Sequence, residues 1–93
     1  MKITKTTINF AARRGIEIYV HEGDKQVWFS QIDEEGEAFC EPFMMYNDND
    51  DCLTYHGNIY LPKEIKEEIP VTIFSEKQLK EVIKFLAEEL KNI

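Results

Sequence analysis

The chain has 93 residues and a net charge of −7 at neutral pH; 43% of its residues are hydrophobic and 31% are charged. A chain of this length buries only about 60–65% of its unfolded surface, too little for two cores, so we expect a single domain over residues 1–93. The mixed composition argues against intrinsic disorder, and the negative charge argues against direct binding to nucleic acid.

Predicted strands fill the first two thirds of the chain. Residues 2–10, KITKTTINF, are expected to add a strand at one edge of a sheet. The strongest strand signal is IEIYVH at 16–21, where apolar and polar side chains alternate. With a short turn and QVWFSQI at 26–32, it predicts a hairpin. Further strands are expected at 37–46, where a proline marks a bulge or an edge, and at 53–61.

The last third of the sequence changes to a helical period. Prolines confine 61–70 to at most one or two helical turns, and VTIF at 71–74 is typical of a short buried strand. Ser75 and Gln78 form a capping box at the start of a helix over about 76–91. The apolar residues of that helix recur at 3.6-residue spacing: Leu79, Val82, Ile83, Leu86 and Leu90.

An amphipathic helix needs an apolar surface to cover, and the predicted strands supply it. We therefore predict an α+β fold, an antiparallel β-meander of about four to five strands packed against one C-terminal amphipathic helix. The first residues, MKITKTTINFAARRG, contain no unbroken apolar run, so neither a signal peptide nor a membrane span is predicted there. We expect a cytoplasmic protein.

The negative charge is concentrated in one part of the chain. Residues 22–51 carry ten acidic residues against Lys25 alone, a net −9, whereas residues 1–21 carry +3 and residues 52–93 carry −1. A field of this sign attracts basic protein surfaces. We expect a protein partner with a basic surface, bound through Trp28 and through the acidic residues Glu22, Asp24, Asp33, Glu34, Glu35, Glu37, Asp48, Asp50 and Asp51. Tyr19 and Tyr55 are further candidates for exposed aromatic anchors.

The acidic stretch NDNDD at 47–51 resembles a calcium loop only at first sight. An EF-hand loop needs oxygen ligands at positions 1, 3 and 5, glycine at position 6 and glutamate at position 12. Counted from Asp48, position 5 is Cys52 and position 12 is Ile59, so the pattern fails. Counted from Asn47, it fails as well. Asn and Asp also bond their own backbone in turns, which favours a polar hairpin turn here.

One structural zinc ion is the alternative that the sequence leaves open. Cys40, Cys52 and His56 are zinc-ligand types, and His21 or one of the aspartates is a candidate fourth ligand, but their spacing matches no common zinc motif. If Tyr46 faced Cys52 across the turn, Cys40 and His56 would be diagonal neighbours about 7 Å apart. Cys52 would then lie about 13 Å from His56 along an extended strand. The competing interpretation is that the cysteines are small buried core residues.

No catalytic constellation is predicted. Cys52 and His56 are four positions apart on a strand, too far for a thiol to reach its base, and no third group orients them. The carboxylates cluster in turns that water reaches, whereas catalytic acids and bases are typical of sites shielded from water. The four glycines are isolated, so no phosphate-binding loop is present. We therefore do not expect an enzyme.

A compact, acidic α+β domain without catalytic residues resembles the small inhibitor proteins of phages and other mobile elements, including anti-CRISPR proteins. The likeness is one of type, carried by the acidic block from Glu22 to Asp51 and by the capped helix from Ser75. Those inhibitors share no common motif, so no individual site is transferred. The resemblance implies a protein that inhibits a CRISPR effector nuclease by covering a basic, nucleic-acid-binding groove, in the host cytoplasm if a phage encodes it. The alternative is a zinc-stabilised structural or regulatory domain without catalytic activity.

Overall fold

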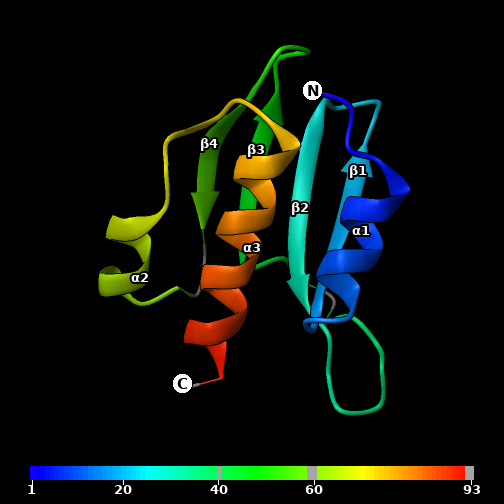
Figure 1. Ribbon diagram of the computed structural model, residues 1–93, viewed down its shortest axis with the longest axis vertical. Coiled ribbons are helices and arrows are strands. Elements are labelled where there is room, and N and C mark those ends of the chain that lie inside the picture. Colours follow the sequence, from blue (N-terminus) through cyan, green and yellow to red (C-terminus); the bar gives the residue numbers. More distant parts are fainter. Residues whose placement is uncertain (40, 59–60, 92–93) are drawn as a thin grey trace.

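The computed structural model describes residues 1–39, 41–58 and 61–91 (Figure 1). Its strands form one antiparallel sheet of five strands in the order β1-β2-β3-β4-β5. In chain order the elements are α1 (Lys5–Ala12), β1 (Ile16–His21), β2 (Gln26–Gln31), β3 (Met44–Asp48), β4 (Leu53–Asn58), α2 (Lys63–Glu68), β5 (Thr72–Ile73) and α3 (Glu76–Leu90).

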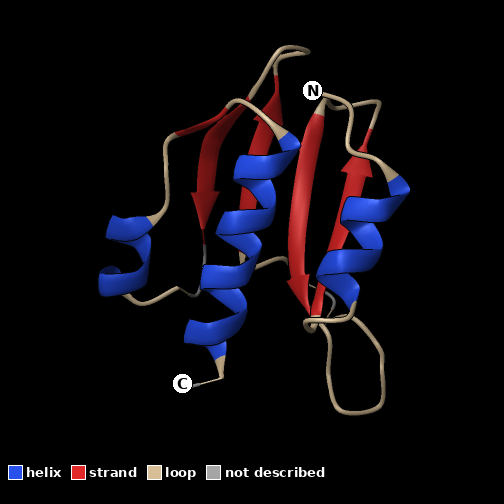
Figure 2. Cartoon of the chain, viewed as in Figure 1, coloured by secondary structure: helices blue, strands red, loops and turns tan. Residues whose placement is uncertain are grey.

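Two helices, α1 and α3, lie on the same face of the sheet, and α2 lies to one side (Figures 1 and 2). The core between these helices and the sheet contains Phe29, Tyr46, Leu79 and Leu86, all fully buried. The predicted α+β fold with an antiparallel meander and a C-terminal amphipathic helix is confirmed. No helix among the described residues covers the opposite face of the sheet, which we call the open face.

The alternation of IEIYVH decides which side chains reach the open face. Ile16 and Ile18 are buried toward the helices, whereas Glu17 and Tyr19 are exposed on the other side. The strand pairs with β2 along its whole length, from Ile16 opposite Gln31 to His21 opposite Gln26, so the predicted hairpin is confirmed.

Helix α3 begins at the predicted cap. The Ser75 hydroxyl accepts a hydrogen bond from the Gln78 amide at 3.1 Å. The Gln78 side chain does not return a bond to Ser75 as a capping box would. It accepts from the Phe74 amide at 2.8 Å and donates to the Thr72 carbonyl at 3.2 Å. Gln78 therefore ties the start of α3 to β5, a strand of two residues within the range predicted for it.

The predicted edge strand at 2–10 is wrong, because residues Lys5–Ala12 form helix α1. Thr7 and Ala11, one helical turn apart, are fully buried against the sheet. The start of the helix is satisfied by a residue distant in sequence, since the Glu76 carboxylate accepts from the Thr4 amide at 3.2 Å. A run of β-branched residues therefore became helical through tertiary contacts that override local propensity.

The strand predicted at 37–46 is also too long, because β3 begins only at Met44. Within the described part of this segment, the chain folds back along β2 through an isolated bridge between Ala38 and Ile32. The Phe43 amide then donates to the Phe29 carbonyl at 2.8 Å. Pro42, between these two contacts, has no amide hydrogen and cannot extend a strand ladder. Residue 40 lies outside the described residues.

The pairing of β3 with β4 differs from the predicted register. Tyr46 faces Tyr55, three positions beyond Cys52, because residues 49–52 form the turn. The Asn49 amide closes this turn by donating to the Cys52 carbonyl at 2.9 Å. The register also shifts between Met45 and Tyr46. Met45 faces Gly57 while Tyr46 faces Tyr55, so His56 is the extra residue of a β-bulge. Strand β4 ends at Asn58, and residues 59–60 of the predicted strand 53–61 lie outside the described residues.

Candidate partner-binding surface

The acidic residues gather at the two opposite ends of the sheet, as a meander requires. The β1–β2 turn, residues 22–25, and the β3–β4 turn, residues 49–52, meet at one end (Figure 1). There the Asp48 amide donates to the Lys25 carbonyl at 2.8 Å, and the Lys25 ammonium lies 3.9 Å from the Asp50 carboxylate. The segment after β2 carries the remaining acidic residues to the other end.

That segment contains a loop at 33–37, which we call the acidic loop. Its backbone is organised by Asp33, whose carboxylate accepts hydrogen bonds from the amides of Glu35 and Glu37, both at 2.9 Å. Gly36 has a φ of +86°, a conformation that favours glycine. The loop belongs to the connection between β2 and β3, which extends to the bottom of the view in Figure 1.

The carboxylates of the acidic loop divide into two roles. All four are exposed, but the Asp33 carboxylate accepts hydrogen bonds that shape the loop, whereas the side chains of Glu34, Glu35 and Glu37 do not. Within the described residues, these three side chains form no hydrogen bond or ion pair. Their charge is therefore not neutralised by any described part of the chain and is directed to solvent.

Asp48 is engaged inside the molecule, unlike the loop glutamates. Its carboxylate accepts a hydrogen bond from the Met1 ammonium at 2.7 Å and from the Asp50 amide at 3.0 Å. Partial burial opposes ionisation of Asp48, but these bonds and the neighbouring positive charges outweigh that cost and lower its pKa. At this turn, the predicted partner-binding carboxylates that are exposed are those of Asp50 and Asp51.

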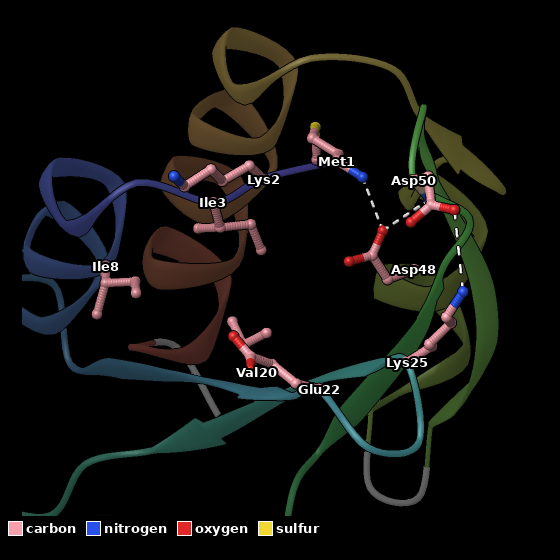
Figure 3. A pocket seen from close by; sticks show the side chains of 9 residues that line it. All are labelled: Met1, Lys2, Ile3, Ile8, Val20, Glu22, Lys25, Asp48 and Asp50. Atoms are coloured by element: carbon pink, nitrogen blue, oxygen red, sulfur yellow. Dashed lines mark hydrogen bonds and ion pairs between the residues drawn. The ribbon is translucent and has the colours of Figure 1, made fainter.

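The same contacts close one side of a hollow of about 590 Å³ beside the N-terminal segment (Figure 3). Ile3, Ile8 and Val20 supply apolar side chains to it, and the charged residues around it are of both signs. Dashed lines in Figure 3 connect Met1, Asp48, Asp50 and Lys25 in a chain of ion pairs and hydrogen bonds. The two positive and two negative charges of these four residues sum to zero, so they give the hollow no net charge that would favour a ligand of either sign.

Three aromatic rings cluster on the open face of the sheet, and we call Tyr19, His21 and Trp28 the aromatic platform. The ring centroids of His21 and Trp28 are 4.1 Å apart, those of Tyr19 and His21 are 4.6 Å apart, and those of Tyr19 and Trp28 are 6.5 Å apart. Tyr19 is 52% exposed, and Trp28 and His21 are half-buried. The sequence indicated that these rings face away from the core, since Tyr19 and His21 alternate with the apolar residues of IEIYVH.

Tyr55, the other expected aromatic anchor, faces the helices. It packs edge-to-face against Tyr46 with ring centroids 5.7 Å apart and belongs to the border of the core. Burial, with a smaller effect from Tyr55, raises the pKa of the Tyr46 hydroxyl, which donates to the Pro70 carbonyl at 2.6 Å. The expectation that Tyr55 is exposed is therefore wrong. Phe39, at 51% exposure, is an exposed aromatic residue that the sequence did not single out.

The candidate zinc ligands are dispersed in the part of the chain that the structure describes. His21 lies in the aromatic platform with its Nδ1 3.8 Å from the Asp24 carboxylate, His56 is the exposed bulge residue of β4, and Cys52 is half-buried in the β3–β4 turn. In residues 1–39, 41–58 and 61–91, no three His, Cys, Asp or Glu residues form a group able to hold a metal ion. Cys40 lies outside these ranges, so its pairing with His56 stays a prediction, although the strand register used to predict it is wrong.

No known protein family, curated protein or solved structure matches this chain. Among the described helices, none is both long and apolar enough to cross a membrane.

Proposed function

We propose that this protein binds a protein partner through a basic surface of that partner and thereby inhibits or modulates it. The observation that carries the proposal is the acidic loop, where Glu34, Glu35 and Glu37 are exposed without a hydrogen bond or ion pair to the described residues. Charges of one sign on a surface steer association with oppositely charged surfaces and raise the association rate. Glu22, Asp24, Asp50 and Asp51 extend the acidic surface to the opposite end of the sheet.

The partner class that fits best is a nucleic-acid-binding protein. CRISPR effector nucleases hold the guide–target duplex in a positively charged channel, which an acidic protein can occupy in competition with nucleic acid. The proposed function is therefore anti-CRISPR-like inhibition of such a nuclease, exercised in the cytoplasm. This assignment is supported by the charge and its placement on loops.

A binding and cleavage assay with a panel of purified CRISPR effector nucleases tests the proposal. The wild-type protein is expected to bind at least one of them and to reduce its DNA cleavage. The triple variant Glu34→Lys, Glu35→Lys, Glu37→Lys is expected to weaken that binding by about tenfold or more, because each change replaces attraction with repulsion.

A matched variant separates the acidic loop from net charge alone. Glu67→Lys, Glu68→Lys and Glu81→Lys change the net charge by the same amount at exposed positions on α2 and α3. This control is expected to bind almost as well as wild type. If both variants weaken binding equally, the acidic loop is not part of the binding surface. If the wild-type protein binds no effector nuclease, the anti-CRISPR-like assignment is wrong.

A further inference from the structure

We infer that the aromatic platform on the open face of the sheet binds arginine side chains of the basic partner. The inference rests on the proposed function for the basic character of the partner, and it adds a second contact surface with its own chemistry. It names the residue type that the partner presents, which charge attraction alone does not specify.

The platform lies on the neighbouring strands β1 and β2, and its face continues onto β3. Tyr19 of β1 faces Trp28 of β2, which in turn faces Met45 of β3. Paired residues in a sheet project to the same side, and Tyr19 lies on the face away from α1 and α3. With adjacent strands about 4.8 Å apart, these side chains form a band roughly 10 Å wide, enough for an extended side chain to lie across.

The rings are held in place before any ligand arrives. The Trp28 indole nitrogen donates a hydrogen bond to the Gln26 side-chain oxygen at 3.1 Å. The His21 ring lies against Trp28, and the Tyr19 ring meets His21 edge-to-face. Since these contacts already restrict the rings, less conformational entropy is lost on binding.

Carboxylates on both sides of the platform favour a cationic ligand. Glu17 precedes Tyr19 by two positions on the same face of β1 and is exposed. At the other end, the exposed Asp24 carboxylate lies 3.8 Å from His21. Lys25, the basic residue of this turn, lies 3.9 Å from Asp50. Aromatic faces next to carboxylates suit the planar guanidinium of arginine, which stacks on rings and pairs with carboxylates through its N–H groups.

The same charges argue against a second copy of this chain as the occupant. A dimer formed through the open faces would bring the Glu17 and Asp24 carboxylates of both copies into one interface, in a protein whose net charge is −7. A basic segment of another protein meets no such repulsion.

Fluorescence gives a direct test, because Trp28 is the only tryptophan in the chain. The probe is a blocked peptide of alternating arginine and glycine, titrated against the full-length protein while Trp28 emission and its indole N–H resonance are followed. The control peptide carries citrulline, which keeps the shape of arginine without its charge. The arginine peptide is expected to shift both signals, and the citrulline peptide to leave them unchanged.

Single substitutions locate the binding. Tyr19→Leu removes an exposed ring. It is expected to lower the affinity for the arginine peptide by about two- to fivefold, the size of a cation–π contact at an exposed site. Glu17→Gln is expected to weaken it as well, whereas Glu67→Gln on α2 is expected to leave it unchanged. Unchanged affinity in Tyr19→Leu, or equal response to the citrulline peptide, would overturn the inference. A concentration-dependent dimer lost in Tyr19→Lys would assign the open face to a second copy and overturn it too.

The inference and the proposed function can be disproved independently of each other. If a bound effector nuclease loses affinity for the acidic-loop variant but not for Tyr19→Leu or Trp28→Phe, the proposed function stands and the platform is wrong. If the arginine peptide binds the platform while no basic protein partner binds, the platform stands and the proposed function falls.

Discussion

The hydroxyl of Thr7 in α1 donates a hydrogen bond to the carboxylate of Glu76 at the start of α3, 69 positions further along the chain. The amide and the hydroxyl of Thr4 donate to the same carboxylate, at 3.2 and 2.8 Å. Glu76 therefore lies at the N-terminal ends of two helices, where a negative charge is stabilised by the peptide dipoles. This contact joins the two helices that cover the sheet.

Removing this carboxylate is expected to destabilise the fold. Glu76→Gln keeps the shape but loses the charge and is expected to lower the free energy of unfolding by about 1 kcal/mol, less than is usual for hydrogen bonds to charged groups because the site is partly exposed. Urea denaturation measures this difference. Glu81→Gln, an exposed carboxylate elsewhere on α3, is the control and should stay within about 0.5 kcal/mol of wild type. No difference between the two variants would contradict the role of Glu76.

The carboxylates of Glu76 and Asp48 predict that the folded protein loses stability in acid. Hydrogen bonds from Thr7, and less strongly from Thr4, lower the pKa of Glu76, and the pKa of Asp48 is lowered in the folded state as well. The two ionised carboxylates therefore contribute their full stabilisation above their pKa values in the unfolded chain, about 4. This stabilisation is lost as the pH falls through their lower pKa values in the folded protein. The double variant Asp48→Asn, Glu76→Gln should show a smaller drop in unfolding free energy between pH 6 and pH 3 than wild type. A drop equal to that of wild type would contradict this account.

Asp33 is expected to order the acidic loop without binding the partner itself. Asp33→Ala removes the acceptor of the Glu35 and Glu37 amides, so hydrogen exchange at these two amides should become faster. Asp33→Asn keeps one oxygen and should slow exchange relative to Asp33→Ala. The control is Glu34→Ala, whose side chain makes no hydrogen bond or ion pair in the described structure. Equal exchange in all three variants would show that the Asp33 carboxylate does not hold the loop.

The buried hydroxyl of Tyr46 connects the sheet to the segment before β5. Tyr46→Phe removes its hydrogen bond to the Pro70 carbonyl and is expected to cost about 1–2 kcal/mol of unfolding free energy. Thermal denaturation with Tyr19→Phe as control checks this, since Tyr19 is 52% exposed and its substitution should have little effect. Equal melting temperatures for the two variants would contradict the role of the Tyr46 hydroxyl.

Local patterns predicted the elements whose signals lie within a few residues of one another. The alternation of 16–21 and the helical stripe ending at Leu90 both follow from periodicity, and the Ser75 cap follows from a short-range hydrogen bond. Helix α1 was missed because its N-terminus is satisfied by Glu76 and its buried face is set by tertiary packing. Neither effect is visible in residues 2–10.

The candidate surface was predicted by composition but not by geometry. A charge count finds the acidic block, yet it cannot show that Asp48 bonds to Met1 while Glu34 remains exposed. The register of β3 and β4 depends on the position of the turn between them. Because the turn lies at 49–52 and not at 47–51, the partner of Tyr46 moved by three residues and the predicted neighbours of His56 changed. The aromatic platform required the pairing of Tyr19 with Trp28, which only the hairpin register supplies.

The measurement that tests the central claim most directly is the salt dependence of partner binding. Affinity for the effector nuclease that the wild-type protein inhibits is measured between 50 and 500 mM salt, alongside the acidic-loop variant Glu34→Lys, Glu35→Lys, Glu37→Lys. Binding through exposed carboxylates predicts that wild-type affinity falls steeply as salt rises, and that the gap between wild type and variant narrows. An affinity that stays constant across this range, with no gap between the two proteins at low salt, would contradict binding through the acidic loop.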